Sequence, residues 1–145
     1  MFEFSVCRND TGKVTGFDLG DMRFSFGEKE ISSKGSPRLL MMVYLSVVSL
    51  VDTLLGLKVG RKCEFVGVDS SFSLFFELQK KGVSVWVENE LLGVCDFCIF
   101  IKAIDKGIEV FLNDGNPLPP TDPVYNDFHS ALKNLKLAVA ACERG

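Results

Sequence analysis

The sequence predicts an α+β fold in which two βββα units form a mainly antiparallel sheet, with helices packed on one face and an additional C-terminal helix. Three observations lead to this prediction. Short segments with an apolar residue at every second position, typical of half-buried strands, come in two runs of three. Each run is followed by a segment with helical apolar spacing. The length of 145 residues fits a single domain, 1–145.

The first run of strands lies before residue 32. Its three segments cover residues 2–7, 14–19 and 22–26. The sequence Asn-Asp-Thr-Gly at 9–12 predicts the turn after the first strand. Ile31 extends the third strand after a bend at Gly27. Because adjacent short strands favour antiparallel pairing, we expect a meander here.

A long apolar helix is predicted to follow, over residues 39–57, with Ser36 as its N-cap and Pro37 in its first turn. This segment is long enough to span a bilayer. However, Asp52 would lie in the inner half of such a span, at a cost of about 2.5–3.5 kcal/mol near its centre. We therefore expect a buried core helix rather than a membrane segment.

The second run of strands is predicted between residues 63 and 88. Its segments cover residues 63–68, 72–78 and 83–88, with turns at 69–71 and 79–82. An amphipathic helix follows at 92–112, because apolar residues recur there at steps of three and four. After a proline-rich connector, Asp122 is expected to cap the last helix, with Pro123 at its first position.

Composition and charge exclude several classes of protein. The formal net charge of −3 argues against a nucleic-acid-binding protein, which would normally carry a basic patch. The first six residues lack both a basic region and an apolar run, so we expect no signal peptide. We expect no cofactor, because phosphate-binding glycine loops are missing. The predicted location is therefore the cytoplasm, without a membrane or a nucleic acid as partner.

The five cysteines are expected to be reduced thiols, since their number is odd and their neighbours are apolar. Cys95 and Cys98 have the C-x-x-C spacing of a redox pair. A thioredoxin-like site would follow a strand in a βαβ unit, whereas a meander precedes this pair. A zinc site would need a second closely spaced pair of ligands. Buried structural thiols are therefore the favoured interpretation, and no metal is predicted.

No catalytic motif is complete. His129 is the only histidine, and its neighbour Ser130 would face another direction on a helix. The stretch at 67–72 (GVDSSF) lacks the second glycine of a hydrolase nucleophile elbow and lies between two strands. The sequence therefore predicts a protein that is not an enzyme, although a thiol enzyme that uses Cys95 or Cys98 is an open alternative.

The order of segments from 36 to 111 carries a family resemblance. A hydrophobic helix (PRLLMMVYLSVVSLVDTLLGL) leads into two strands (CEFVGVDSSFSLFFEL), then a short strand (GVSVWVE) and an amphipathic helix (CDFCIFIKAIDKGIEVFL). This order resembles small bacterial immunity proteins of polymorphic-toxin and contact-dependent growth-inhibition systems. The resemblance implies a cytoplasmic protein that binds and neutralises one cognate toxin domain, with a basic nuclease among the candidate toxins. It supplies no shared catalytic residue.

The predicted contact residues are polar or aromatic and lie near turns and strand ends. They are Asp69, Ser70, Ser71, Trp86, Glu88 and Glu90. Tryptophan is enriched at binding hot spots, which is the reason for including Trp86. For each residue alone, an ordinary solvated turn or strand position is the simpler interpretation. The alternative function is a non-enzymatic adaptor or oligomeric subunit that binds a protein through the open face of the sheet.

Overall fold

The computed structural model describes residues 1–80 and 82–145 and has an α+β fold, as the sequence predicted. Within these residues, eight strands form two antiparallel four-stranded sheets rather than one. The first sheet contains β1 (Phe2–Arg8), β2 (Leu19–Phe26), β3 (Lys29–Ser32) and β4 (Met41–Met42). The second contains β5 (Lys62–Val66), β6 (Ser73–Gln79), β7 (Gly82–Val87) and β8 (Glu90–Asp96).

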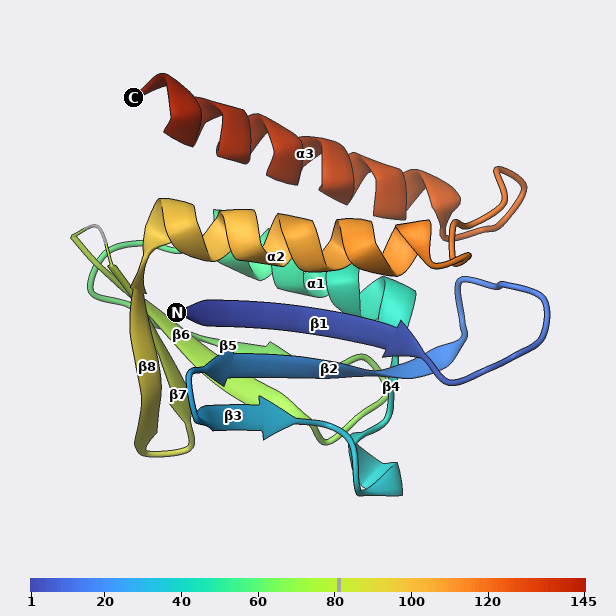
Figure 1. Cartoon of the computed structure of the whole chain (residues 1–145), viewed down its shortest axis with the longest axis horizontal. Coiled ribbons are helices and arrows are strands. Elements are labelled where there is room, and N and C mark those ends of the chain that lie inside the picture. The colour runs from blue at the N-terminus through green and yellow to red at the C-terminus, as the bar shows by residue number, and fades with distance from the viewer. Residues whose placement is uncertain (81) are drawn as a thin grey trace.

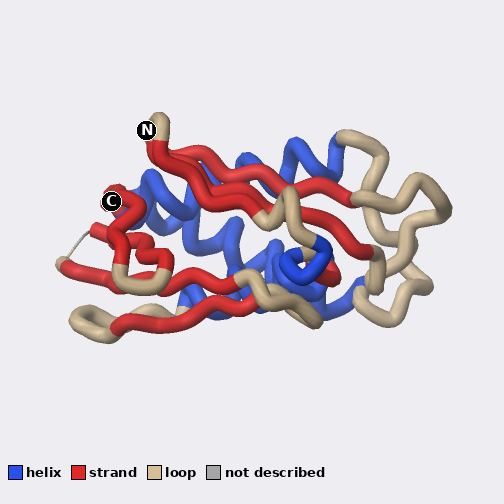
Figure 2. The backbone as a smooth tube through the Cα atoms, turned by 90° about the horizontal axis from the view of Figure 1, so that it is seen from below, coloured by secondary structure: helices blue, strands red, loops and turns tan. Residues whose placement is uncertain are grey.

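Three α-helices complete the described part of the fold: α1 (Val43–Leu55), α2 (Phe97–Asn113) and α3 (Tyr125–Arg144). In Figure 1, α2 runs along β1, and α3 lies outermost, beyond α1 and α2 as seen from the strands. Seen from below, the strands form two separate bands with the helices behind them (Figure 2). The order of layers is therefore strands, then α1 and α2, then α3.

One hydrophobic core joins the two sheets. The ring of Phe24 on β2 lies 6.3 Å from that of Phe72, which directly precedes β6, and 6.2 Å from that of Phe76 on β6. Phe100 of α2 stacks on Phe2 of β1, with ring centroids 4.3 Å apart, and its edge meets Phe76. Because these fully or almost fully buried rings come from both sheets and α2, the two sheets share one core.

The long apolar segment is a buried helix, as predicted, but α1 starts later than expected. Pro37–Leu39 forms a single 3₁₀ turn, and Ser36 makes no side-chain cap bond. Met41 and Met42 then pair with β2, so the helix begins at Val43. In the described part of the chain, no helix is both long enough and apolar enough to cross a membrane.

Two strand predictions in the first run need correction. Residues 14–18 form a loop, because the Asp18 carboxylate accepts hydrogen bonds from the backbone N–H and the hydroxyl of Thr15. Ile31 does not extend β2. Instead, the chain reverses at Gly27, which has a positive φ of 62°, and β3 pairs back onto β2. A hairpin therefore replaces the predicted bend.

The second unit has one strand more than predicted. Residues 90–96 form β8, although the sequence predicted a helix from 92, because a short apolar run suits either state. The helix α2 starts at Phe97, where the Asp96 side chain accepts hydrogen bonds from the N–H groups of Cys98 and Ile99. The predicted 79–82 turn includes residue 81, which lies outside the described residues; Gln79 and Gly82 at its ends pair as expected.

The last helix begins at Tyr125, three residues after the predicted cap. Asp122 accepts a hydrogen bond from the N–H of Val124 and a second from Gly16 in the β1–β2 loop, both at 2.9 Å. Lys136 of α3 forms ion pairs with Asp105 and Glu109 of α2. Polar contacts therefore attach α3 to both the first sheet's loop and its neighbouring helix.

Candidate functional site

The six predicted contact residues lie together at one end of the second sheet. Asp69, Ser70 and Ser71 form the turn between β5 and β6. Glu88 lies in the turn between β7 and β8, and Glu90 is the first residue of β8. In an antiparallel sheet, alternate turns lie at the same end, so the two turns are neighbours across β6 and β7.

The predicted contact residues in the two turns differ in whether their polar groups form hydrogen bonds within the protein. The Ser70 hydroxyl donates to the carbonyl of Leu39 at 2.9 Å and accepts from the N–H of Phe72. The Ser71 N–H donates to the carbonyl of Arg38. Ser70 is therefore part of the turn's own hydrogen bonding. Asp69 and Glu88 are exposed and have positive φ angles of 58° and 55°, a conformation that costs a non-glycine residue energy.

Trp86 lies in the central row of the second sheet's outer face. The neighbouring residues Phe65, Leu74, Phe76, Val83 and Val85 point inward and are buried. The alternate residues therefore point outward. The register aligns Glu64, Phe75, Trp86 and Leu91 in one row and Lys62, Glu77, Ser84 and Val94 in the next. These eight residues are called the outer face of the second sheet below.

The outer face combines apolar area with acidic groups. Leu91 and Val94 keep 37% and 59% of their surface exposed, and Phe75 is half-buried. Glu64 stands beside Phe75, and Glu77 lies between Lys62 and Ser84. Sequence reasoning singled out Trp86 but missed its row, because only the strand register shows which residues lie beside it.

The indole of Trp86 has an unusual environment. The Lys62 ammonium lies 4.1 Å from the ring centroid, within the range of a cation–π interaction. The indole Nε1 is buried, yet it has no hydrogen-bond acceptor among the residues that the structure describes. An unsatisfied buried donor costs about 1–3 kcal/mol. A change that brings an acceptor to Nε1 would therefore be favourable.

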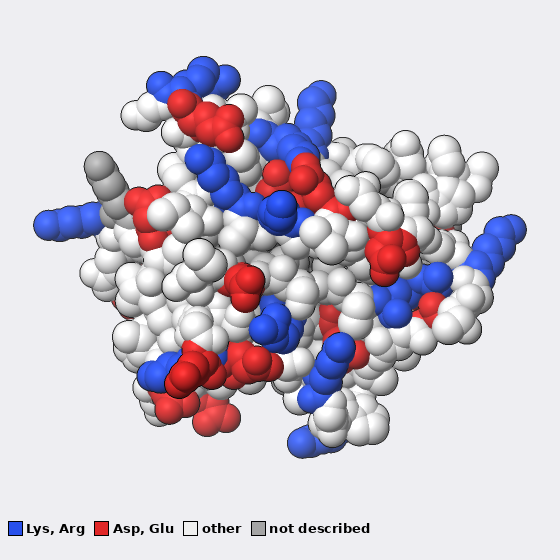
Figure 3. Space-filling model, viewed as in Figure 1, with Lys and Arg blue, Asp and Glu red and all other residues white. Residues whose placement is uncertain are grey.

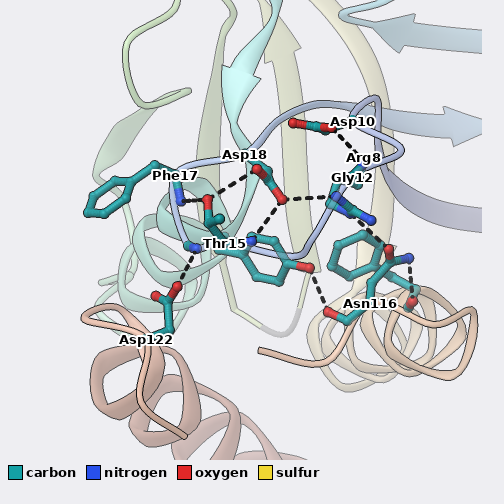
Figure 4. Close-up of polar contacts among 11 residues, drawn as sticks. Arg8, Asp10, Gly12, Thr15, Phe17, Asp18, Asn116 and Asp122 are labelled. Atoms are coloured by element: carbon teal, nitrogen blue, oxygen red, sulfur yellow. Dashed lines mark hydrogen bonds and ion pairs between the residues drawn. The ribbon is translucent and has the colours of Figure 1, made fainter. Parts of the chain in front are cut away.

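A cluster of polar side chains that was not predicted lies at the end of the first sheet (Figure 4). Arg8 at the end of β1 donates to Asp18 through Nη1 at 3.0 Å and to Asn116 through Nε at 3.1 Å. The Tyr44 hydroxyl donates to the carbonyl of Asn116 at 2.5 Å. We call these four residues the Arg8 cluster. Its members are separated by up to 108 positions, so no local sequence pattern could reveal it.

The Arg8 cluster is a structural connection between the β1–β2 loop, α1 and the segment that joins α2 to α3. The Arg8 and Asp18 side chains are only 9% and 7% exposed, and each charge has hydrogen-bond partners. Burial, with smaller contributions from Asp18 and Asp122 and an opposing one from Arg8, raises the pKa of Tyr44 to about 12. The phenol is therefore a neutral hydrogen-bond donor at physiological pH.

The cysteines correct one prediction. Cys98 and Cys142 form a disulfide between the first turn of α2 and the last turn of α3, so these two are not reduced thiols. Cys95 is not paired with Cys98 and is a half-buried free thiol, as are Cys7 and Cys63. Burial, and then the adjacent Asp96, raise the pKa of Cys95, which makes it a poor nucleophile at neutral pH.

Other groups with potential chemistry are scattered. His129 is exposed on α3 and packs against the ring of Tyr125, with centroids 4.1 Å apart. Within residues 1–80 and 82–145, no three histidine, cysteine or acidic side chains come close enough to hold a metal ion. The outer face of the second sheet is therefore the site that we consider further. No family model, curated protein or solved structure matches this chain.

Proposed function

We propose that this chain is an immunity-type protein that binds a bacterial toxin domain and neutralises it by covering its active site. The contact surface is the outer face of the second sheet together with the turns at 69–71 and 88–90. The observation that supports this proposal most directly is the row Phe75–Trp86–Leu91, an aromatic and apolar strip that points outward on the antiparallel second sheet. A rigid sheet presents such a strip without the entropic cost of ordering a loop on binding.

Trp86 is the expected energetic centre of this interface. Large aromatic side chains in the middle of a contact surface contribute most of the binding energy, and a surrounding ring of weaker contacts excludes water. Phe75 and Leu91 flank the indole on both sides. A toxin carbonyl or carboxylate that reaches Nε1 would supply the acceptor that this group lacks.

The charges around the strip favour a basic partner. Glu64, Glu77, Glu88 and Glu90 lie on this face or at its adjoining turn, against the single cation Lys62 on the face. Acidic groups of this kind attract a basic active-site surface, such as that of a nuclease, and speed association. The net charge of −3 is small, so the local arrangement rather than the whole-protein charge supports this target.

An immunity protein of this kind works in the cytoplasm, where thiols are kept reduced. The Cys98–Cys142 disulfide of this structure joins α2 to α3, which the Lys136 ion pairs also hold together. The binding surface lies on the second sheet, so it does not depend on this disulfide.

Co-expression with the product of the adjacent upstream reading frame tests the proposal, because immunity proteins are encoded beside their toxins. The wild-type chain should restore growth and co-purify with that product. Trp86→Ala should weaken the complex by about 2 kcal/mol or more, which is about 30-fold in Kd. Glu88→Lys should also weaken it, whereas Glu143→Lys at the exposed end of α3 should not. Absence of both rescue and complex would refute the proposal.

The chain carries its own reporter for this surface, since Trp86 is its only tryptophan. Titration with the partner should therefore change the intrinsic tryptophan emission of the wild-type chain. The partner's own tryptophans are controlled by repeating the titration with Trp86→Phe. If the partner changes the emission by the same amount in both titrations, Trp86 does not report the contact, and the contact lies elsewhere on the molecule.

A second candidate function is an adaptor or oligomeric subunit that uses the same face. The exposed side chains of Leu91 and Val94 on β8, the last strand of its sheet, favour this candidate. Sedimentation of the isolated chain at several concentrations separates the two. A concentration-dependent oligomer that Val94→Lys disrupts would support the subunit, and a monomer at all concentrations would exclude self-assembly.

A further inference from the structure

A groove of about 450 Å³ runs between β1 and α2, away from the second sheet. One wall is the backbone and outward side chains of residues 1–6, including Glu3 and Ser5. The other wall is the exposed side of α2, with Lys102, Lys106 and Val110. This volume lies within the range of about 300–1,000 Å³ that ligand sites occupy.

The groove exists because α2 carries small residues where it runs along β1. Gly107 is buried, and a β-carbon there would lie 2.7 Å from Phe4 Cδ2 and closer still to the Phe4 carbonyl oxygen. Ala103 stands one turn earlier on the same side of the helix. Because Ala103 and Gly107 have little or no side chain, the helix backbone lies against the edge of β1. The larger residues beside them, such as Val110, which is 60% exposed, therefore project from the helix and form one wall of the groove.

The two lysines give the helix wall a positive charge. Lys102 and Lys106 are exposed and form no ion pair within the described part of the chain. They are four residues apart on a helix, so their positions differ by about 6 Å along its axis. Glu3 on the opposite wall repels an anion from that side. On the face drawn in Figure 3, both signs of charge occur in small groups with uncharged surface between them.

These dimensions match an extended peptide. Alternate residues of a strand point to the same side and are about 6.6 Å apart, close to the spacing of the two lysines. The six residues of the β1 wall extend over about 17–20 Å, the length of five or six residues of an extended peptide. The groove is partly open to solvent, which leaves room for a chain to enter and leave.

We propose that the groove between β1 and α2 binds an extended segment of a partner protein that carries acidic residues at alternate positions. The two acidic side chains pair with Lys102 and Lys106, and the apolar side chains between and beside them lie on the floor formed by Ala103 and Gly107. This site is independent of the proposed toxin contact, because it lies on the first sheet and α2 and shares no residue with the outer face of the second sheet.

Fluorescence anisotropy with a labelled peptide, Leu-Glu-Val-Glu-Leu, tests the proposal on the full chain. The peptide should bind, and two control peptides should bind more weakly. One replaces both glutamates by glutamine, and the other has the same composition with adjacent glutamates (Leu-Val-Glu-Glu-Leu). Binding should also weaken as salt rises, because exposed charge pairs are screened.

Variants of the protein locate the site. Lys102→Gln and Lys106→Gln should each weaken binding about two- to fivefold, the range of exposed ion pairs. The double charge reversal Lys102→Glu with Lys106→Glu should abolish it, and Glu3→Gln should strengthen it. Lys133→Gln, on α3 and outside the groove, is the matched control. All four positions are exposed, so circular dichroism should show the wild-type fold in each variant.

The outcomes separate this proposal from the toxin contact. Peptide binding that survives Trp86→Ala but not the double lysine reversal supports the groove. No binding of the alternating peptide to the wild-type chain at peptide concentrations up to about 1 mM overturns the proposal. Equal binding of the alternating and the adjacent-glutamate peptides, or of wild type and the double reversal, overturns it as well.

Discussion

Gly107→Ala offers a sharp test of how α2 packs, because two effects of opposite sign compete. Gly107 is buried in the middle of α2, and its α-carbon faces the edge of β1. A β-carbon would lie 2.7 Å from Phe4 Cδ2 and 3.1 Å from the Phe4 carbonyl carbon, whereas ordinary contacts are 3.4–4 Å. The helix must therefore move from β1 by several tenths of an ångström or more.

The magnitudes decide which effect prevails. Alanine is favoured over glycine in a helix interior by about 1 kcal/mol. Overpacking of a close contact costs about 1–3 kcal/mol, and the contact here includes backbone atoms of a sheet, which cannot rotate away. Because the clash includes backbone atoms, its cost lies in the upper half of that range, about 2–3 kcal/mol. After the helix-propensity gain of about 1 kcal/mol is subtracted, we expect Gly107→Ala to destabilise the protein by about 1–2 kcal/mol, with a larger loss for Gly107→Val.

Urea denaturation, followed by circular dichroism and by the emission of Trp86, measures this difference. The matched control compares Asn134→Ala with Asn134→Gly, since Asn134 is exposed in the middle of α3 and reports helix propensity alone. Alanine should be the more stable of that pair. If Gly107→Ala is as stable as the wild type or more stable, the close packing of α2 on β1 is refuted.

Three further predictions concern connections within the fold. Asp18→Ala leaves the Arg8 guanidinium buried without its counter-charge and should cost about 3–5 kcal/mol in urea denaturation; adding Arg8→Met should restore part of it, and no restoration would contradict the ion-pair argument. Because burial raises the pKa of Tyr44 to about 12, the stabilisation from its neutral phenol should be complete below pH 10 and should decline between pH 10 and 12, by at most about 2.7 kcal/mol. Tyr44→Phe should lack this decline, and identical pH profiles of stability for the wild type and this variant would refute the prediction. Reduction of the disulfide that closes 44 residues should cost about 2–4 kcal/mol; the double variant Cys98→Ser with Cys142→Ser should be insensitive to reductant, and a wild-type urea midpoint unchanged by reductant would contradict the expectation.

The fold class could be predicted because strand and helix periodicities are strong local signals. Phe2, Phe4 and Val6 alternate as a half-buried strand must, and their buried faces match the pattern. The segment 90–96 was misassigned because Leu91, Leu92 and Val94 suit a helix as well as a strand. The division into two sheets depends on long-range pairing, such as Met41 with Gly20, which no local pattern encodes.

The candidate site, too, could be predicted only where local sequence patterns define it. Trp86 and the acidic turn residues could be chosen from the sequence, because residue type and turn position are local properties. The neighbours of Trp86 could not, since Phe75 and Leu91 reach it only through the register of three strands. The disulfide escaped prediction for the same reason, because Cys98 and Cys142 are brought together by the packing of α3 on α2.

The packing of α2 along β1 also constrains how the chain folds during synthesis. The first sheet leaves the ribosome early, whereas the helix that covers the edge of β1 begins only at Phe97. Until then, the inward rings of Phe2 and Phe4 lack the helix that buries them. A nascent chain halted before that point exposes an uncovered strand edge and should be a substrate for chaperones that hold extended apolar segments. Completion of the first sheet's core therefore awaits the last third of the protein.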